Sequence, residues 1–255
     1  MARVFRSEPF YDKLKAYFAS LYRNQYKLLG WEAKPGESDR TATLRSTVIQ
    51  MMGMSGDESV EEEATRLFLD LTSASPSMSV PGDLQQVIFK LALRHDEEKV
   101  YGVLKEIFER VEGSPEEKRN ALSTMGCVVD PVRHASMLDY VFFSGKVRLQ
   151  DMAFPLGALS ATSDEGGRLT WTFLRDNFST LQSKYKDSVM WGNIVGLSCR
   201  GLTEAVEADQ VEEFFKDRTG SATRRLSQAL EIVRTRAQRR VRDREALKRF
   251  LEQRF

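Results

Sequence analysis

The sequence predicts an all-α protein, an α-solenoid of HEAT- or armadillo-like antiparallel helix pairs with about thirteen helices. Apolar residues recur at helical spacing along nearly the whole chain, and strand-like alternation is missing. Helix starts also repeat: Asp57, Asp96, Asp130 and Asp164 each open an amphipathic segment, at intervals of 39, 34 and 34 residues. A two-helix unit with a period in the thirties is typical of helical solenoids.

The clearest repeat unit is a helix pair with almost no loop. Ser114 is predicted to cap the first helix, with Pro115 at its first position and Glu117 completing a capping box. Asp130 and Pro131 then end that helix and begin the next one, because the residue before proline avoids the α region. A pair this short cannot bury its own apolar faces, so it needs neighbours on both sides.

The remaining helices of the first half follow apolar stripes that glycine or proline interrupts. Gly30 is predicted to cap the end of the first helix, and Gly56 breaks the second. Residues 72–82, TSASPSMSVPG, are open to two interpretations, a flexible linker or a long loop between helices, and we expect the loop because repeats continue on both sides. The predicted segments are 10–29, 40–54, 58–71, 83–94 and 96–108.

The second half continues the same pattern. Pro155 interrupts or starts the eighth helix, since proline is tolerated only in a first helical turn. After the pair around Asp130, the predicted segments are 149–160, 165–185, 189–199, 203–217, 221–236 and 241–255.

The length allows one large domain or two small ones, and we predict a single α-solenoid domain over residues 1–255. The 41% hydrophobic and 29% charged composition is ordinary for a soluble helical protein. No run of 18 apolar residues exists, so we expect no membrane span. The N-terminus lacks the apolar core of a signal peptide, and we expect a cytoplasmic chain. Cys127 and Cys199 lie in apolar helical contexts, which favours buried free thiols over a disulfide.

No arrangement of residues predicts chemistry in this chain. His95 and His134 flank helix starts, where we expect solvated side chains, and there is no HExxH pair or Cys/His cluster for zinc. No GxSxG elbow or glycine-rich phosphate loop is present. Gly166-Gly167 at the start of a helix is only a faint echo of such a phosphate loop, and a turn or a tight helix–helix contact explains the pair as well. We therefore predict no catalytic residue, no metal ligand and no cofactor within the chain.

The C-terminal stretch is basic. Residues 218–255 carry twelve Lys or Arg and four Asp or Glu, a net charge of +8 against about −7 for the remainder. This stretch is open to two interpretations, a nucleic-acid-binding face or helices whose arginines pair with the acidic part of the chain or with a partner. Apolar residues at helical spacing give it a core face, and aromatic residues for base stacking are almost absent, so we do not expect nucleic acid.

Several segments, taken in order, resemble the C-terminal helical domain of zinc aminopeptidases related to aminopeptidase N and puromycin-sensitive aminopeptidase. Individually they are helix-core patterns, and their order and spacing carry the likeness. The segments are Gly30-Trp31, TATLRSTVIQMM (41–52), VEEEATRLF (60–68), RNALSTMGCVVDPVRHASMLDYVF (119–142), LTWTFLRDNFSTLQSKY (169–185), VEEFFKD (211–217), RRLSQALE (224–231) and the closing LKRFLEQRF.

The resemblance implies a solenoid that curls into a bowl over a catalytic domain. In that family the zinc ligands and the exopeptidase motif lie in the upstream domain, so zinc belongs to the parent enzyme and this chain is expected to be its C-terminal fragment. Its partners would be that upstream domain and a peptide substrate. The chain departs from the family near Gln238, where a tryptophan is usual.

Three arginines are candidates for binding the carboxylate of a peptide. Arg94, Arg133 and Arg200 lie near the ends of helices that would form a concave face, and they are chosen by charge type alone. Two other functions stay open: a stand-alone HEAT-like scaffold that binds a protein or, through its arginine-rich end, nucleic acid, and an independent enzyme.

Overall fold

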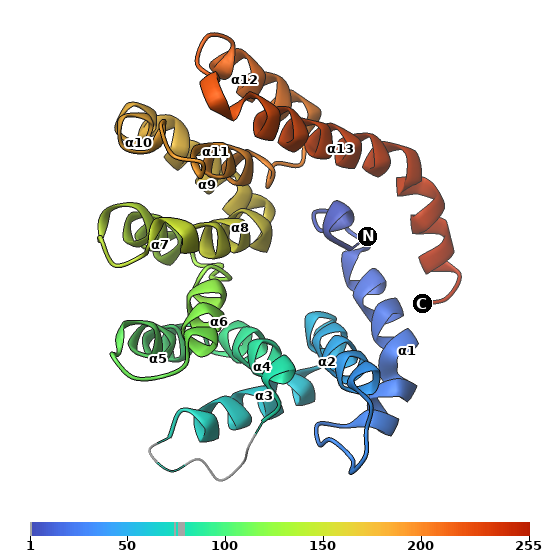
Figure 1. The fold of residues 1–255 in the computed structure, drawn as a ribbon. Helices are drawn as coiled ribbons and strands as arrows, with labels where there is room; N and C mark the ends of the chain where they lie inside the picture. Colours follow the sequence, from blue (N-terminus) through green and yellow to red (C-terminus); the bar gives the residue numbers. More distant parts are fainter. Residues whose placement is uncertain (1, 74, 76–79) are drawn as a thin grey trace. The chain divides into compact units, whose positions relative to one another are not determined.

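A computed structural model describes residues 2–73, 75 and 80–255 of the chain (Figure 1). Over these residues the fold consists of thirteen α-helices and three short 3-10 helices, with no strand. Consecutive helices pack against one another in pairs, such as α3 with α4 and α8 with α9. The prediction of an all-α protein built from solenoid-like helix pairs is confirmed. Residues 74 and 76–79 of the predicted 72–82 loop lie outside the described residues.

The chain divides into two compact units that exchange their terminal segments. Unit 1 contains residues 3–7 and 125–247, and unit 2 contains residues 2, 8–124 and 248–255. Each unit therefore includes a piece that is remote in sequence from the rest of it.

Unit 2 is formed by the first six helices. The helix α1 packs on α2, α2 and α3 both pack on α4, and α4 packs on α5. The bounds are α1 Tyr11–Leu29, α2 Asp39–Met54, α3 Glu58–Leu71, α4 Gly82–His95, α5 Glu97–Glu109 and α6 Pro115–Met125. The last residues of the chain complete this unit, where Phe250 meets Tyr17 of α1 edge to face, with ring centroids 5.3 Å apart.

Unit 1 is formed by the remaining helices. The central helices α8, α9 and α11 pack on one another, and α7 packs on α8 and α9. The bounds are α7 Pro131–Phe143, α8 Ala153–Thr162, α9 Asp164–Asp176, α10 Phe178–Tyr185, α11 Trp191–Cys199, α12 Ala205–Phe215 and α13 Thr223–Glu252; the short 3-10 helices are η1 Ala2–Phe5, η2 Leu149–Asp151 and η3 Gly220–Ala222. The end of α13, from residue 248, belongs to unit 2.

Most predicted helix starts and stops are confirmed by their caps. The side chain of Asp130 accepts a hydrogen bond from the Arg133 amide (2.8 Å), and the Ser114 hydroxyl accepts one from the Glu117 amide (3.0 Å). Gly30 ends α1 with a left-handed φ of 56°, and its amide donates to the Tyr26 carbonyl at 2.8 Å. These are local interactions between close neighbours in sequence, which is why the sequence predicts them.

Two predicted cap details are wrong. The Glu117 carboxylate accepts a hydrogen bond from Arg110, rather than closing a capping box with Ser114. The α9 helix is capped by Ser163, whose hydroxyl accepts from the Gly166 amide at 2.7 Å, so Asp164 lies one position later, in the first turn.

Two predicted helix boundaries are also wrong. The predicted helix 165–185 is divided at Asn177, whose side-chain amide donates to the Phe173 carbonyl at 3.0 Å and ends α9. The break lets Phe178 turn into the core against Trp191, at a centroid distance of 5.8 Å. Conversely, the predicted helices 221–236 and 241–255 are one helix, α13.

The continuity of α13 follows from a stripe of inward residues. Apolar side chains are buried at both ends of this stripe. The polar residues between them are the reason why the sequence predicts two separate helices. Arg240 falls on the same stripe, and its guanidinium pairs with the Glu204 carboxylate, so the helix continues through the polar stretch. The buried residues of the stripe are Leu226, Leu230, Val233, Ala237 and Leu251.

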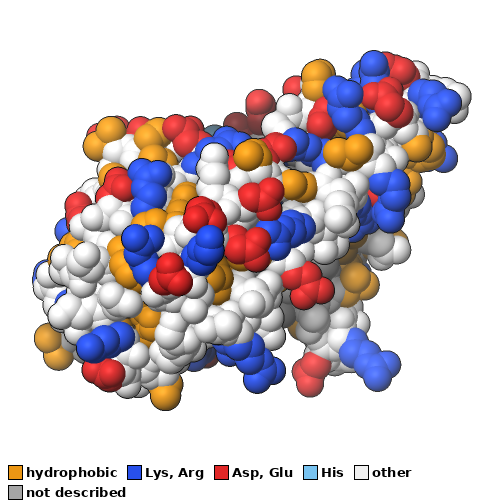
Figure 2. All heavy atoms as spheres, turned by 90° about the horizontal axis from the view of Figure 1, so that it is seen from above, with side chains coloured by type: hydrophobic (Ala, Val, Ile, Leu, Met, Phe, Trp, Pro, Cys, Tyr) orange, Lys and Arg blue, Asp and Glu red, His pale blue; other side chains and the backbone are white. Residues whose placement is uncertain are grey.

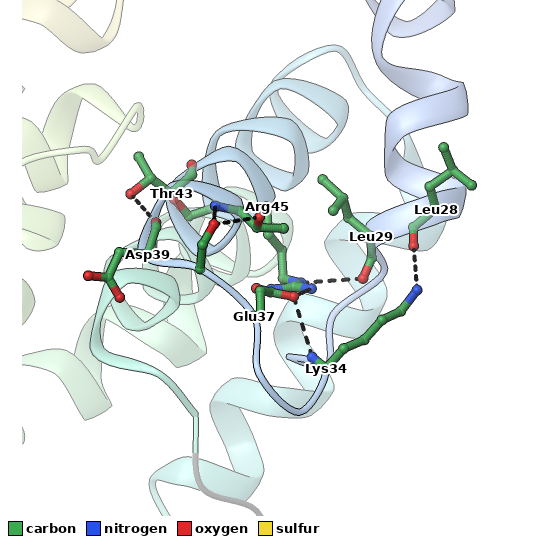
Figure 3. Close-up of polar contacts among 10 residues, drawn as sticks. Leu28, Leu29, Lys34, Glu37, Asp39, Thr43 and Arg45 are labelled. Atoms are coloured by element: carbon green, nitrogen blue, oxygen red, sulfur yellow. Dashed lines mark hydrogen bonds and ion pairs between the residues drawn. The ribbon is translucent and has the colours of Figure 1, made fainter.

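A buried ion pair fixes the turn between α1 and α2 (Figure 3). The Arg45 side chain on α2 is 1% exposed and holds the Glu37 carboxylate through both terminal nitrogens, with Nη2 to Oε2 at 2.5 Å. Its Nε donates to the carbonyl of Leu29, the last residue of α1, at 3.3 Å. The Arg45 hydrogen bonds lower the pKa of the Glu37 carboxyl. One guanidinium thus joins the end of one helix, the loop and the next helix.

Glycines let the backbones of unit 1 approach closely. A Cβ on Gly167, in the first turn of α9, would lie 2.5 Å from the Gly201 carbonyl oxygen. A Cβ on Gly201 would lie 2.1 Å from the Ser160 carbonyl oxygen. The Gly166-Gly167 pair therefore serves a tight helix contact, one of the two explanations that its sequence suggests.

We expect the Arg45→Met substitution to lower the midpoint of thermal unfolding by roughly 5 °C or more, because it leaves the Glu37 carboxylate and the Leu29 carbonyl without their buried donor. Circular dichroism at 222 nm measures the transition. The matched control is Arg66→Met, which removes an exposed pair with Glu63 of the same chemistry (2.7 Å) and should shift the midpoint little. Equal shifts for the two variants would contradict a structural role for the buried pair.

We expect two glycine-to-alanine substitutions in helices to act in opposite directions. Gly167→Ala should destabilise the protein by about 1–3 kcal/mol, because the added Cβ meets backbone atoms that cannot move aside. Gly102→Ala in α5 should stabilise it by about 0.4–1 kcal/mol, because a Cβ there meets nothing within 4 Å. Denaturant unfolding measures both values, and destabilisation by the second substitution would contradict this account.

Candidate functional site: an arginine cluster

Four arginines gather in unit 1, where the ends of α8 and α11 meet. Arg3 in η1 donates from Nη2 to the Ser160 carbonyl at 2.8 Å and to the Gly201 carbonyl at 3.4 Å. Arg236 on α13 donates from Nη1 to the carbonyl of Arg200 at 2.7 Å. Two guanidinium groups from opposite ends of the chain therefore bind consecutive carbonyls. We call Arg3, Arg6, Arg200 and Arg236 the arginine cluster.

The cluster forms at helix C-termini. Arg6 donates from Nη1 to the carbonyl of Thr162, the last residue of α8, at 2.5 Å. Carbonyls in a last helical turn have no partner within the helix, and the helix dipole places partial negative charge there. These carbonyls therefore attract and hold cationic side chains.

The positive charges of the cluster repel one another. Burial, together with the positive charges of Arg236, Arg6 and Arg200, lowers the pKa of Arg3 to about 10, while Asp164 acts in the opposite direction. Burial and the charge of Arg200 also lower the pKa of Arg236. The Nε atom of Arg3 is buried without a hydrogen-bond partner. Such a cluster has the charge and the donors to attract an anion.

The structure places one of the three predicted peptide-binding arginines in this cluster. Arg200 follows the end of α11, and its residue is exposed. Arg133 is half-buried in the first turn of α7, also in unit 1. Arg94 belongs to unit 2, where its Nε binds the Glu61 carboxylate at 2.7 Å. The contacts within the units thus do not gather the three residues at one site.

Sequence reasoning missed Arg3, Arg6 and Arg236. The first two precede the first predicted helix, and the third lies in the basic stretch. More than 200 residues therefore separate Arg3 and Arg6 from Arg236 along the chain. The one signal in the sequence is the pair of arginines in ARVFR, which no local pattern connects to α8 or α11.

His134 is buried, whereas its place near a helix start predicts a solvated side chain. It is 1% exposed, and its Nε2 lies 3.0 Å from the hydroxyl oxygen of Thr170 on α9. That hydroxyl donates to the Gly166 carbonyl at 2.7 Å, so it accepts from the histidine, whose Nε2 therefore carries a proton. Burial lowers the pKa of His134 to about 4. His95 is exposed, as expected.

The cysteines are free thiols, as predicted. Cys127 is half-buried and Cys199 is fully buried, and burial raises the pKa of the Cys199 thiol. Among the residues that the structure describes, no group of three or more His, Cys, Asp or Glu side chains is placed to hold a metal ion. Within the same residues no helix has the length and apolar character needed to cross a membrane.

The basic stretch uses several of its arginines within unit 1. Arg234 on α13 binds both Asp209 (2.7 Å) and Glu212 (2.6 Å) of α12, and Arg240 binds Glu204. On the face drawn in Figure 2, Lys/Arg and Asp/Glu side chains are intermixed rather than separated into fields of one sign. These contacts favour the interpretation in which the arginines pair with the acidic part of the chain.

Comparison with known proteins finds a family model and aminopeptidases that match most of the chain. A family model described as ERAP1-like C-terminal domain matches residues 1–235. Aminopeptidase 2, mitochondrial, from Saccharomyces cerevisiae is 26% identical over 98% of this chain and 26% of that protein. Aminopeptidase M1-A from Oryza sativa subsp. japonica is 27% identical over 88% of this chain and 25% of that protein. The chain spans about a quarter of the length of these curated relatives.

We expect acid to destabilise the protein through His134. Its pKa of about 4 in the folded state lies below the ordinary 6.5, so between these two pH values the unfolded chain binds more protons. The free energy of unfolding should therefore fall as the pH drops from 6.5 towards 4, by up to about 3 kcal/mol from this residue.

Urea unfolding of the wild type and of His134→Gln at pH 7.5 and pH 4.5 measures this contribution. The variant should lose less stability on acidification than the wild type, while the exposed His95→Gln should behave like the wild type. The same loss in His134→Gln as in the wild type would show that other groups carry the acid sensitivity.

Proposed function

Because the chain belongs to the ERAP1-like C-terminal domain family, we propose that it is the C-terminal domain of a zinc metallo-aminopeptidase that removes N-terminal residues from peptides. The family match over residues 1–235 is the observation that carries the proposal. Aminopeptidases that align with nearly the whole chain at 24–27% identity support it.

In this proposal the domain does no chemistry of its own. The zinc and the residues that cleave the peptide bond belong to a catalytic domain upstream on the same polypeptide, which is the principal partner of this chain. The helical domain walls the chamber in which peptides bind, and it limits which peptides enter.

Arg200, Arg133 and Arg94 are the proposed contacts for the carboxylate of a bound peptide. Arg200 has the strongest support, because it is exposed, its carbonyl binds the guanidinium group of Arg236 and the next carbonyl, of Gly201, binds that of Arg3. Adjacent cations raise the local concentration of an anion, and a guanidinium group can bind a carboxylate through two parallel hydrogen bonds. The Glu61 pair leaves Arg94 the weakest of the three candidates.

We expect Arg200→Ala in the full-length enzyme to weaken its preference for peptides with a free C-terminal carboxylate over the same peptides with an amidated C-terminus. The ratio of the two kcat/KM values should fall by roughly threefold to tenfold, because a charge-assisted hydrogen bond contributes about 1 kcal/mol or more. Peptides of increasing length identify the length at which the carboxylate reaches the site.

The matched control is Arg175→Ala, which removes an exposed arginine of unit 1 paired with Asp176 and should leave the ratio unchanged. Arg133→Ala and Arg94→Ala test the other two candidates. An unchanged ratio in all three candidate variants would remove the carboxylate contacts while leaving the domain assignment in place. The absence of aminopeptidase activity in the full-length polypeptide would overturn the assignment itself.

A further inference from the structure

The segment 3–7, here called the strap, precedes α1 of unit 2 but belongs to unit 1. Phe5 is 1% exposed and anchors it by burial. Arg3 and Arg6 anchor it through the carbonyls at the end of α8 and after α11, and Ser7 lies 3.5 Å from Nη1 of Arg240. Burial of Phe5 and hydrogen bonds from Arg3 and Arg6 thus hold the strap on unit 1.

The acceptors of the strap are backbone groups that cannot neutralise its charge. Ser160, Thr162 and Gly201 offer carbonyl oxygens, and the close approach of Gly201 to Ser160 leaves no room for a side chain at that point. Hydrogen bonds to neutral acceptors fix the orientation of a guanidinium group, but they do not neutralise its positive charge.

The charges around the strap oppose its docking. Because Arg3 and Arg236 bind consecutive carbonyls, their guanidinium groups are held close together, and Arg6 and Arg200 act on Arg3 with the same sign. Asp164 is the carboxylate that attracts Arg3, and its Oδ1 atom is buried without a hydrogen-bond partner. Like charges in a partly buried site repel one another more strongly than charges in water.

We propose that residues 3–7 are a releasable strap, held on unit 1 by hydrogen bonds from Arg3 and Arg6 to helix-end carbonyls and opposed by repulsion within the arginine cluster. The strap opens while the helices beneath it stay folded. Its opening releases residues 3–7 from the helix-end carbonyls of α8 and from the carbonyl of Gly201, and along the chain the strap continues into α1. The inference concerns the chain alone and does not rest on the proposed function.

Two substitutions should change the rate of strap opening in opposite directions. Arg200→Gln removes a repelling charge, so amide hydrogen exchange of residues 3–7 should slow by about twofold to fivefold. Asp164→Asn removes the attracting charge, so exchange should accelerate by a similar factor. The matched control is Glu165→Gln, which removes a carboxylate from the same first turn of α9 and should change exchange little.

Salt gives an independent test on the wild-type chain. Raising sodium chloride from 50 to 500 mM screens the repulsion, so exchange of the strap should slow, whereas a strap held by ordinary ion pairs would loosen. Mass spectrometry of the 255-residue chain measures these rates, and peptides from α8 and α11 report the helices beneath.

The proposal is overturned if Arg200→Gln and Asp164→Asn change strap exchange in the same direction or not at all, or if salt accelerates it. It is equally overturned if exchange in α8 and α11 changes by the same factor as in the strap, because opening would then be global unfolding. Because the measurement uses no peptide substrate and no catalytic domain, its failure is distinct from a failure of the proposed aminopeptidase role.

Discussion

The carbonyl groups in the last turn of each helix lack partners within that helix, and a chain of many short helices has many such groups to satisfy. This protein satisfies several of them with cationic side chains that lie outside the helix concerned. The same interaction therefore ends helices, joins neighbouring helices and positions loops. The donor–acceptor pairs are Arg45 with Leu29, Lys184 with Phe142, Arg3 with Ser160, Arg236 with Arg200 and Arg218 with Phe214.

This use of arginine gives the uneven charge of the chain a structural explanation. Residues 218–255 carry a net charge of +8, and in unit 1 arginines of this stretch bind α12 carboxylates and helix-end carbonyls. The planar guanidinium suits this role, because it can bind several acceptors at once and remains charged. Where several such contacts converge, as around Arg3, their hydrogen bonds are favourable while their charges repel one another.

Sequence reasoning predicts this fold well wherever the deciding interaction is local. The caps at Ser114 and Asp130 and the stop at Gly30 involve residues within four positions of one another, and all three are confirmed. The errors arise where a distant partner decides. Asn177 breaks a helix so that Phe178 can reach Trp191, and Glu204 lets α13 continue through Arg240.

In the candidate site, too, the sequence predicts local features but not distant partners. Arg200 can be selected for its charge beside a helix end, but nothing in the sequence reveals that Arg3 and Arg236 bind the carbonyls beside it. The place of His134 near a helix start predicts a solvated side chain, yet the side chain is buried and bonds to Thr170, 36 residues later. A helix start is exposed only where no neighbouring helix covers it, and that depends on tertiary packing.

The exchange of terminal segments between the two units bears on how the protein matures. Within this chain, residues 3–7 are synthesised before the helices they bind, which lie within residues 125–247, and residues 248–255 complete unit 2. Neither unit is complete until almost all of the residues up to 255 have been made, and both require closure of loops more than 100 residues long, a slow step in folding. A nascent chain therefore carries two unfinished cores at once, which is a situation that chaperones relieve.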